Sequence, residues 1–132
     1  MSYRYPRKSP HILRIKRASA GLGLFTTGDI KRGEFVIEYH GPILNEEKAN
    51  EKGGRFLFAL SSKLTIDGIA RDNIARYMNH SCRPNCTPEI DGRRIFFYAR
   101  RKIMAGEELT YNYGREYFDG FIKPRGCRCD HH

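Results

Sequence analysis

Several features of exported, membrane-bound or repetitive proteins are missing from this sequence. No apolar run approaches the roughly 20 residues that a membrane-spanning helix needs. The first 17 residues hold six basic side chains and no acidic one, and they lack the apolar segment of a signal peptide. Internal repeats and low-complexity segments are also absent. The 132 residues therefore predict one intracellular globular domain with no membrane partner, in the cytoplasm or nucleoid of a bacterium or in a eukaryotic host nucleus.

Common nucleotide-binding and hydrolase motifs are missing as well. Gly21 and Gly23 are not followed by the third glycine of a dinucleotide fingerprint, and no P-loop is present. His80 and Ser81 are adjacent in the sequence, which is not the arrangement of a catalytic triad. These absences set aside dinucleotide binding, P-loop nucleotide binding and acyl transfer.

The charge is strongly positive, with a formal net value of +9. The basic side chains form two clusters: Arg4, Arg7, Lys8, Arg14, Lys16 and Arg17, and then Arg93, Arg94, Arg100, Arg101 and Lys102. Such clusters can meet nucleic acid or an acidic partner, or they can form a solvated face. Neither cluster belongs to a recognisable nucleic-acid module, which favours the solvated face. Nucleic acid is thus a possible partner but not a required one, and an oligomer is also possible.

Short apolar segments separated by turn residues predict a mainly β domain after a loosely held basic arm in the first ten residues. Asn45 is expected to cap a short helix at 46–52, which Gly53 and Gly54 stop. A glycine-rich turn is expected at 20–24, a turn at Asp67 and Gly68, and a helical turn at 73–78. Strands are expected at 12–16, 35–44 (ended by Gly41 and Pro42), 56–60, 64–66, 95–98 and 109–113.

Two polar runs are candidates for chemistry. Residues 79–86 read Asn-His-Ser-Cys-Arg-Pro-Asn-Cys and follow the apolar pair Tyr77 and Met78, and residues 106–113 read Gly-Glu-Glu-Leu-Thr-Tyr-Asn-Tyr. Taken alone, the first run could be a plain turn rich in asparagine. Tyr111 and Tyr113 lie two apart on a predicted strand and so share a face, where core packing is the commoner use.

The order of the motifs resembles that of SET-domain protein lysine methyltransferases, in particular small stand-alone members from bacteria and viruses. The matching elements are Gly-x-Gly, Glu38-Tyr39-His40-Gly41, Asn-His-Ser-Cys-x-Pro-Asn, Gly-Glu-Glu-Leu-Thr-Tyr-Asn-Tyr and Cys-x-Cys, over residues 12–129. The resemblance implies a mainly β fold of small curved sheets with a C-terminal pseudoknot and one or two short helices. Residues 1–11 would be the arm, 12–117 the SET domain and 118–132 a post-SET-like segment.

The resemblance also implies an activity. The protein would use S-adenosylmethionine to methylate a lysine side chain of a protein, for example a histone or another DNA-associated basic protein, mainly to the mono-methyl state. The alternatives are a catalytically inactive binding module with the same fold and a basic nucleic-acid-binding protein. Decayed family members usually lose one of the residues present here as Tyr39, Asn79, His80 and Tyr113, which favours an active enzyme.

Site roles are carried over residue by residue. The implied cofactor-binding residues are Leu22, Gly23, Leu24, Phe56, Asn79 and His80, with phenylalanine at 56 where many relatives have tyrosine. Tyr39, Phe58 and Tyr111 are the implied walls of the lysine channel, and Tyr113, Tyr111 and Tyr39 the implied catalytic residues. Tyr113 would act as a base or as an orienting group. A tyrosine at 111, where some relatives have phenylalanine, implies fewer methyl groups. Arg76 is expected to pair with Glu107 or Glu108.

Four cysteines remain, and without an export signal disulfides are the less expected use. Cys82, Cys127 and Cys129 resemble the ligands of the family's post-SET zinc site, although no fourth cysteine follows. His131 or His132 could replace that ligand, or the two histidines could be the remains of a purification tag. Cys86 is a further candidate ligand. Alternatively, the thiols stay reduced and pack as small apolar groups.

Overall fold

The computed structural model describes residues 6–54 and 56–114. The elements are β1 (Leu13–Ala18), β2 (Gly21–Thr26), β3 (Phe35–Tyr39), β4 (Ile43–Asn45), α1 (Glu46–Lys52), β5 (Leu57–Ala59), β6 (Leu64–Asp67), η1 (Ile74–Tyr77), β7 (Asn79–His80), β8 (Cys86–Asp91), β9 (Arg94–Ala99) and β10 (Glu108–Tyr111). The predicted mainly β architecture with short helices is confirmed. None of the helices in these two ranges has the length and apolar character that crossing a membrane requires.

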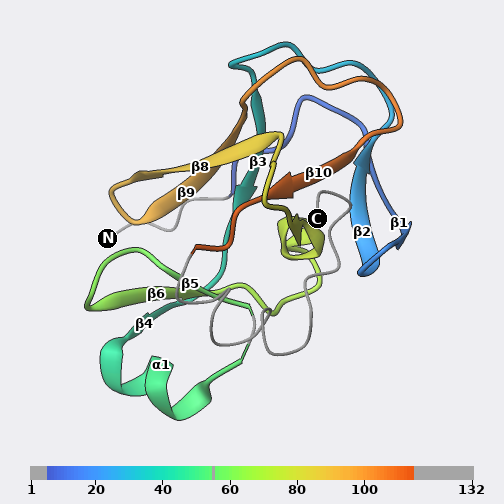
Figure 1. Ribbon diagram of the computed structural model, residues 1–132. Coiled ribbons are helices and arrows are strands. Elements are labelled where there is room, and N and C mark those ends of the chain that lie inside the picture. The colour runs from blue at the N-terminus through green and yellow to red at the C-terminus, as the bar shows by residue number, and fades with distance from the viewer. Residues whose placement is uncertain (1–5, 55, 115–132) are drawn as a thin grey trace.

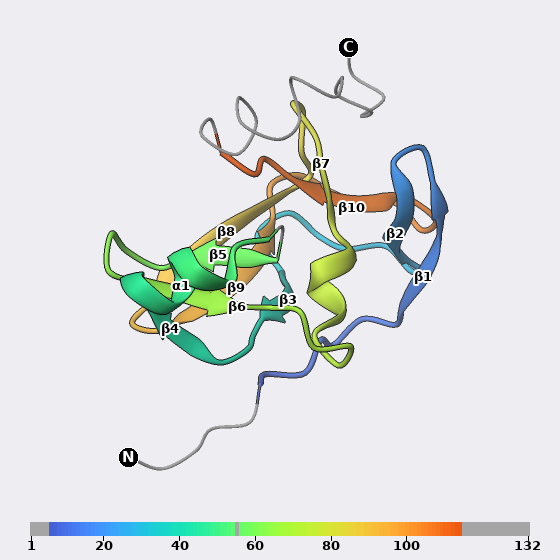
Figure 2. The ribbon, with the colours of Figure 1, turned by 90° about the horizontal axis from the view of Figure 1, so that it is seen from below.

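The strands form three small sheets, with the orders β1-β2-β10-β7, β3-β9-β8 and β4-β6-β5. In Figures 1 and 2, α1 and the β4-β6-β5 sheet lie at the opposite end of the molecule from the β1–β2 hairpin, with η1 between them. Leu24, Ile66, Phe97 and Leu109 come from different strands of all three sheets, and each is at most 2% exposed. The sheets therefore share one core.

The parallel pair β7–β10 joins segments that lie about thirty residues apart in the chain, with Asn79 opposite Thr110 and His80 opposite Tyr111. The Asn85 side chain accepts from the Thr110 amide at 2.9 Å and donates to the Glu108 carbonyl at 2.7 Å. The Ser81 amide donates to the Tyr111 carbonyl at 3.1 Å. These bonds attach residues 79–85 to the last described strand, which is the adjacency that the implied pseudoknot requires.

Locally encoded elements appear where the sequence predicts them. Asn45 caps α1, its side chain accepting from the Lys48 amide at 2.8 Å, and the helix ends at Gly53, whose φ of 60° suits glycine. Both ends are determined by residues within one turn of the helix. Local chemistry alone is therefore sufficient to predict α1.

Other expectations were wrong. The strand expected at 35–44 is two strands, β3 and β4, that belong to different sheets. Gly41 lies between them, and a Cβ at this position would stand 1.9 Å from the Asp67 carbonyl oxygen, so the chain crosses there in close backbone contact. Gly21 to Leu24, expected as a turn, lie in β2. No strand was expected at 86–91, where β8 lies. This strand tolerates Pro88 because it pairs with β9 alone and is therefore an edge strand.

The described part of the N-terminal arm is held in place, contrary to expectation. The Arg7 amide donates to Glu38 Oε1 at 2.7 Å, and its guanidinium lies 3.9 Å from the centre of the Phe35 ring. Glu38 also accepts two hydrogen bonds from Arg94, at 2.9 and 2.7 Å. A single buried carboxylate thus fastens both the arm and β9 to β3.

We expect Arg94→Ala to lower the free energy of unfolding by about 2 kcal/mol, because it leaves the buried Glu38 carboxylate without its two-pronged partner. The neighbouring Arg93 is exposed and serves as a matched control. Arg93→Ala should change the free energy of unfolding by no more than about 0.5 kcal/mol. Urea denaturation of both variants measures the difference, and equal effects would contradict the role given to Glu38.

Candidate functional site

Aromatic side chains predicted for the lysine channel gather at one place, although they come from three sheets. The Phe58 ring on β5 lies 5.2 Å from the Tyr39 ring on β3 and stacks on the Tyr111 ring of β10 at 5.8 Å. The Tyr111 and Tyr113 rings are 4.6 Å apart. The structure therefore brings together all four residues predicted for the channel and for catalysis.

Tyr39 is buried, with 3% of its surface exposed, and both ends of its side chain are confined. Its hydroxyl donates to the Phe56 carbonyl at 2.8 Å. Gly68 lies directly against the ring, because a Cβ there would stand 2.5 Å from the Tyr39 hydroxyl oxygen. No larger residue fits at position 68 without moving the ring.

Tyr113 is held through its backbone and its hydroxyl. Its amide donates to His80 Nδ1 at 3.1 Å, and the two rings meet edge to face at 5.4 Å. Since His80 Nδ1 accepts this bond, the neutral imidazole carries its proton on Nε2. The Tyr113 hydroxyl donates to the Met78 carbonyl. Its proton is thereby committed, and the phenol oxygen is an acceptor toward any further group.

The predicted cofactor residues of β2 and β7 meet where these strands adjoin β10, whereas Phe56 directly precedes β5 in another sheet. The side-chain Nδ2 of Asn79 donates to the Leu22 carbonyl at 2.9 Å and to Glu108 Oε2 at 2.7 Å. At Gly23 a Cβ would stand 2.4 Å from the same carboxylate oxygen, so any larger residue would require the Glu108 side chain to move. Leu24 is fully buried between β1 and β10, whereas Leu22 is 55% exposed.

The expected pairing of Arg76 with Glu107 or Glu108 is wrong. Arg76 donates to the Ile69 carbonyl and to the Tyr77 hydroxyl, and its guanidinium lies 5.0 Å from the centre of the Phe56 ring. Glu107 and Glu108 are neighbours along the chain and face opposite sides. Glu107 pairs with Arg101 at 2.8 Å, which holds the pKa of that carboxyl below its usual value, while Glu108 faces Asn79.

Residues 21–114 match the family model described as the SET domain. The chain belongs to the SET-domain family. It is 37% identical to the histone-lysine N-methyltransferase trithorax of Drosophila virilis over 121 residues. These residues are 83% of this chain and 3% of that protein. It is 41% identical over 105 residues to the H3 lysine-4 specific histone-lysine N-methyltransferase of Schizosaccharomyces pombe, covering 70% of this chain and 11% of the relative.

A human relative, the H3 lysine-36 specific histone-lysine N-methyltransferase, is 35% identical over 123 residues, which are 83% of this chain and 5% of that protein. The chain therefore spans about a tenth or less of the length of these relatives. The matched region lies within the SET domain predicted at 12–117. The family predicted from the order of motifs is confirmed.

The two described cysteines of this SET domain differ in their exposure to solvent. Cys82 is exposed, with its sulfur 3.4 Å from His80 Nε2. Cys86 is 1% exposed, and burial raises the pKa of its thiol to about 12, so it stays protonated and is a poor metal ligand. Cys127, Cys129, His131 and His132 lie outside the described residues. Within the described ranges no group of three or more His, Cys, Asp and Glu side chains could hold a metal, and the zinc site stays a prediction.

Three residues important for the site's geometry were not identified from the sequence. Glu108 was expected only as one of two alternative partners of Arg76, with Glu107, although the alternation of side chains along an extended segment separates the two carboxylates. Gly68 had been interpreted as a turn signal alone. Asn73, which is fully buried, had no assigned role, and its position before a helical turn was the one local signal.

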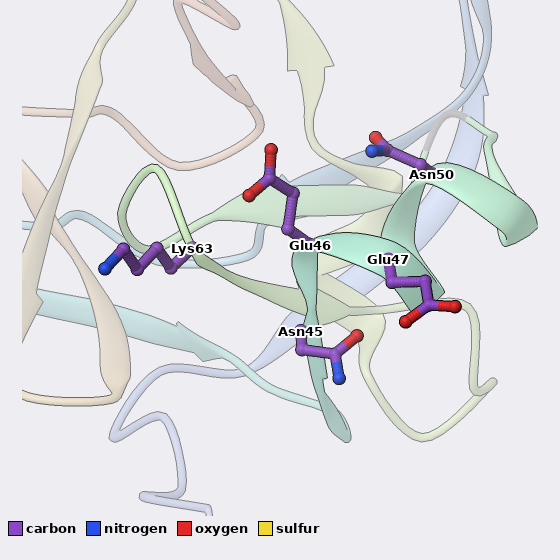
Figure 3. A pocket seen from close by; sticks show the side chains of 5 residues that line it. All are labelled: Asn45, Glu46, Glu47, Asn50 and Lys63. Carbon is purple, nitrogen blue, oxygen red and sulfur yellow. The ribbon is translucent and has the colours of Figure 1, made fainter.

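Two hollows of the SET domain have linings that do not include the four aromatic residues predicted for the channel and catalysis. A shallow one is lined by Asn45, Glu46, Glu47 and Asn50, at the start of α1, and by Lys63 from the β5–β6 loop (Figure 3). A groove of about 850 Å³ is lined by residues that include Glu38, His40, Ile66 and Phe96. Tyr39 belongs to neither lining, whereas its neighbours on both sides line the groove.

Alkylation under native conditions should separate the two cysteines. We expect iodoacetamide at pH 8, with a chelator present so that bound zinc cannot protect Cys82, to modify Cys82 and to spare Cys86. The thiolate is the reacting form, and the raised pKa of Cys86 leaves about one thiol in ten thousand ionised at this pH. Mass spectrometry of the peptides measures both sites, with denatured protein as the control. Equal native modification of the two would contradict the burial of Cys86.

Proposed function

We propose that this SET domain transfers methyl groups from S-adenosylmethionine to a lysine side chain of a histone or a similar basic protein. The observation that carries the proposal is the placement of the aromatic cluster directly beside the Asn79 junction. His80 connects the two, since it pairs with Tyr111 along the strand and contacts the Tyr113 ring. The names of the relatives, all histone-lysine N-methyltransferases, support the same substrate class.

The residues at the junction fit S-adenosylmethionine. That molecule carries a positive sulfonium and a positive ammonium, and the junction offers the Leu22 carbonyl and the Glu108 carboxylate as acceptors. Gly23 lets the ligand approach the backbone. The backbone of 22–24, with Asn79 and His80, would hold the cofactor, and Phe56 would flank it. When bound, S-adenosylmethionine would supply an activated methyl group, whose bond to the sulfonium would break to leave a neutral thioether as the lysine nitrogen forms its new bond to carbon. The methylated ammonium would then release a proton to water.

The aromatic walls prepare the substrate lysine. A lysine in water has a pKa near 10.4, so about one amine in a thousand is neutral at pH 7.4. Moving the ammonium between the rings of Tyr39, Phe58 and Tyr111 removes it from water and lowers its pKa. The Tyr113 oxygen can then accept an N–H of the amine and turn its lone pair toward the methyl group. Because the Tyr113 hydroxyl donates its hydrogen bond to the Met78 carbonyl, the geometry favours an orienting role over that of a base.

Methylation of peptides from the histone H3 and H4 tails, followed by mass spectrometry, tests the proposal. We expect the wild-type protein to add methyl groups to a lysine and Tyr113→Phe to lose about a hundredfold in turnover, because a misoriented nucleophile reacts slowly. Tyr98→Phe is the matched control, since Tyr98 lies on β9 against Phe35. It should keep wild-type turnover. Full activity in Tyr113→Phe would remove the role assigned to its hydroxyl.

The number of methyl groups should depend on Tyr111, which stacks on Phe58 at the channel. A hydroxyl there can hold a water in the volume that a second methyl would need. We expect mono-methyllysine as the main product. Tyr111→Phe should raise the ratio of dimethyl- to mono-methyllysine about tenfold, the effect of roughly 1.4 kcal/mol of lost hydrogen bonding. Trimethyllysine as the main wild-type product would show that another part of the channel sets the limit.

A further inference from the structure

Asn73 is a buried residue whose side chain does not cap the helical turn that it precedes. It occupies the N-cap position of η1, where an asparagine usually accepts a hydrogen bond from the first turn. Here its side chain makes no cap bond, and none of its surface is exposed. A fully buried amide must find partners elsewhere, because leaving it unbonded costs free energy.

Both partners of the Asn73 side chain are backbone groups. Its Oδ1 accepts from the His40 amide at 3.1 Å, and its Nδ2 donates to the Gly68 carbonyl at 3.0 Å. A primary amide is suited to this pair because it carries one acceptor and one donor group at the end of a short side chain. An aspartate would keep the first bond and lose the second.

These two backbone groups flank Tyr39. His40 follows Tyr39 in the chain, and Gly68 packs against the Tyr39 ring. The Gly68 amide and the Tyr39 hydroxyl both donate to the Phe56 carbonyl, each at 2.8 Å. The hydrogen bonds therefore run from Asn73 to the backbone on one side of Tyr39, and from Asn73 through Gly68 and Phe56 to the hydroxyl at its other end.

We propose that Asn73 is a positioning residue that fixes the Tyr39 ring as a wall of the lysine channel. The proposal rests on the proposed function, because it concerns the channel that the substrate amine would enter. Without the Asn73 amide, the Gly68 segment is released from one side and the ring loses the surface that confines it. The channel then holds the lysine less well, whereas the junction around Asn79 is untouched.

A double-mutant cycle between Asn73 and Tyr39 tests this. We expect Asn73→Ala to raise the KM for the lysine peptide about tenfold while the cofactor affinity measured by calorimetry stays the same. In a Tyr39→Ala background, the same change should have less than about a twofold effect on KM, because the ring through which Asn73 acts is gone. Asn73→Asp, which keeps the His40 bond, should lie between the wild type and Asn73→Ala.

Equal effects of Asn73→Ala on KM in both backgrounds, or a fall in thermal stability with no change in KM, would overturn the proposal. If Asn73→Ala does not fold, Gly68→Ala replaces it in the cycle. The added Cβ pushes the ring directly and should raise KM in the wild-type background alone. An equal effect of Gly68→Ala in both backgrounds would likewise overturn the proposal.

Nuclear magnetic resonance of protein labelled at tyrosine separates this proposal from the proposed function. The Tyr39 ring signals should shift in Asn73→Ala while those of Tyr98, on another strand, stay in place. This result would stand even if no peptide were methylated, in which case the proposed function alone would fail. Unchanged Tyr39 signals in a folded Asn73→Ala would overturn the positioning role.

Discussion

The parallel pairing of β7 with β10 is the constraint on which the site depends. It places Asn79 opposite Thr110 and His80 opposite Tyr111, and the two Asn85 bonds to Glu108 and Thr110 keep that register. A shift by one residue would turn every side chain of the short strand to the other face. Asn79 would then leave Leu22, and His80 would leave the amide of Tyr113. One register thus builds the proposed cofactor junction and the side of the proposed channel that holds Tyr111 and Tyr113 together.

The opposite side of the proposed channel depends on close backbone approaches. Tyr39 is enclosed because Gly68 has no side chain, and β3 can pass into β4 because Gly41 has none. The carboxylate of Glu38, one residue before Tyr39, anchors the N-terminal arm and Arg94 on the other face of β3. The strand is therefore fixed on both faces. This rigidity suits the proposed lysine channel, whose proposed mono-methylation requires it to distinguish an amine from the same amine with one more methyl group.

Two kinds of feature could be predicted from the sequence: helix ends, which depend on nearby residues, and candidate site residues, which the order of the family motifs indicates. Asn45 and Gly53 bound α1 as expected, because a helix cap involves residues within one turn. The family motifs identified Asn79, His80, Tyr111 and Tyr113 as candidate site residues, and the structure brings them together.

Long-range contacts explain the failures. The break between β3 and β4 arises from the contact of Gly41 with Asp67, and the held arm arises from the contact of Arg7 with Glu38. The family resemblance implied that Arg76 pairs with Glu107 or Glu108, whereas Glu107, just before β10, pairs with Arg101, and Glu108, the first residue of β10, accepts from Asn79. Its position before a helical turn was the one local signal for Asn73, because its partners are backbone groups: the Gly68 carbonyl, five residues away, and the His40 amide, 33 residues away.

Calorimetric titration with S-adenosylmethionine tests the central claim most directly, namely that the β2–β7–β10 junction is a cofactor site. The folded wild-type protein should bind one molecule per chain. Asn79→Ala, with folding checked by thermal melting, should bind at least about tenfold more weakly, a loss of roughly 1.4 kcal/mol. Asn50→Ala, on the exposed surface of α1, is the matched control and should keep full affinity. A folded wild type that does not bind, or equal affinities in the two variants, would contradict the account.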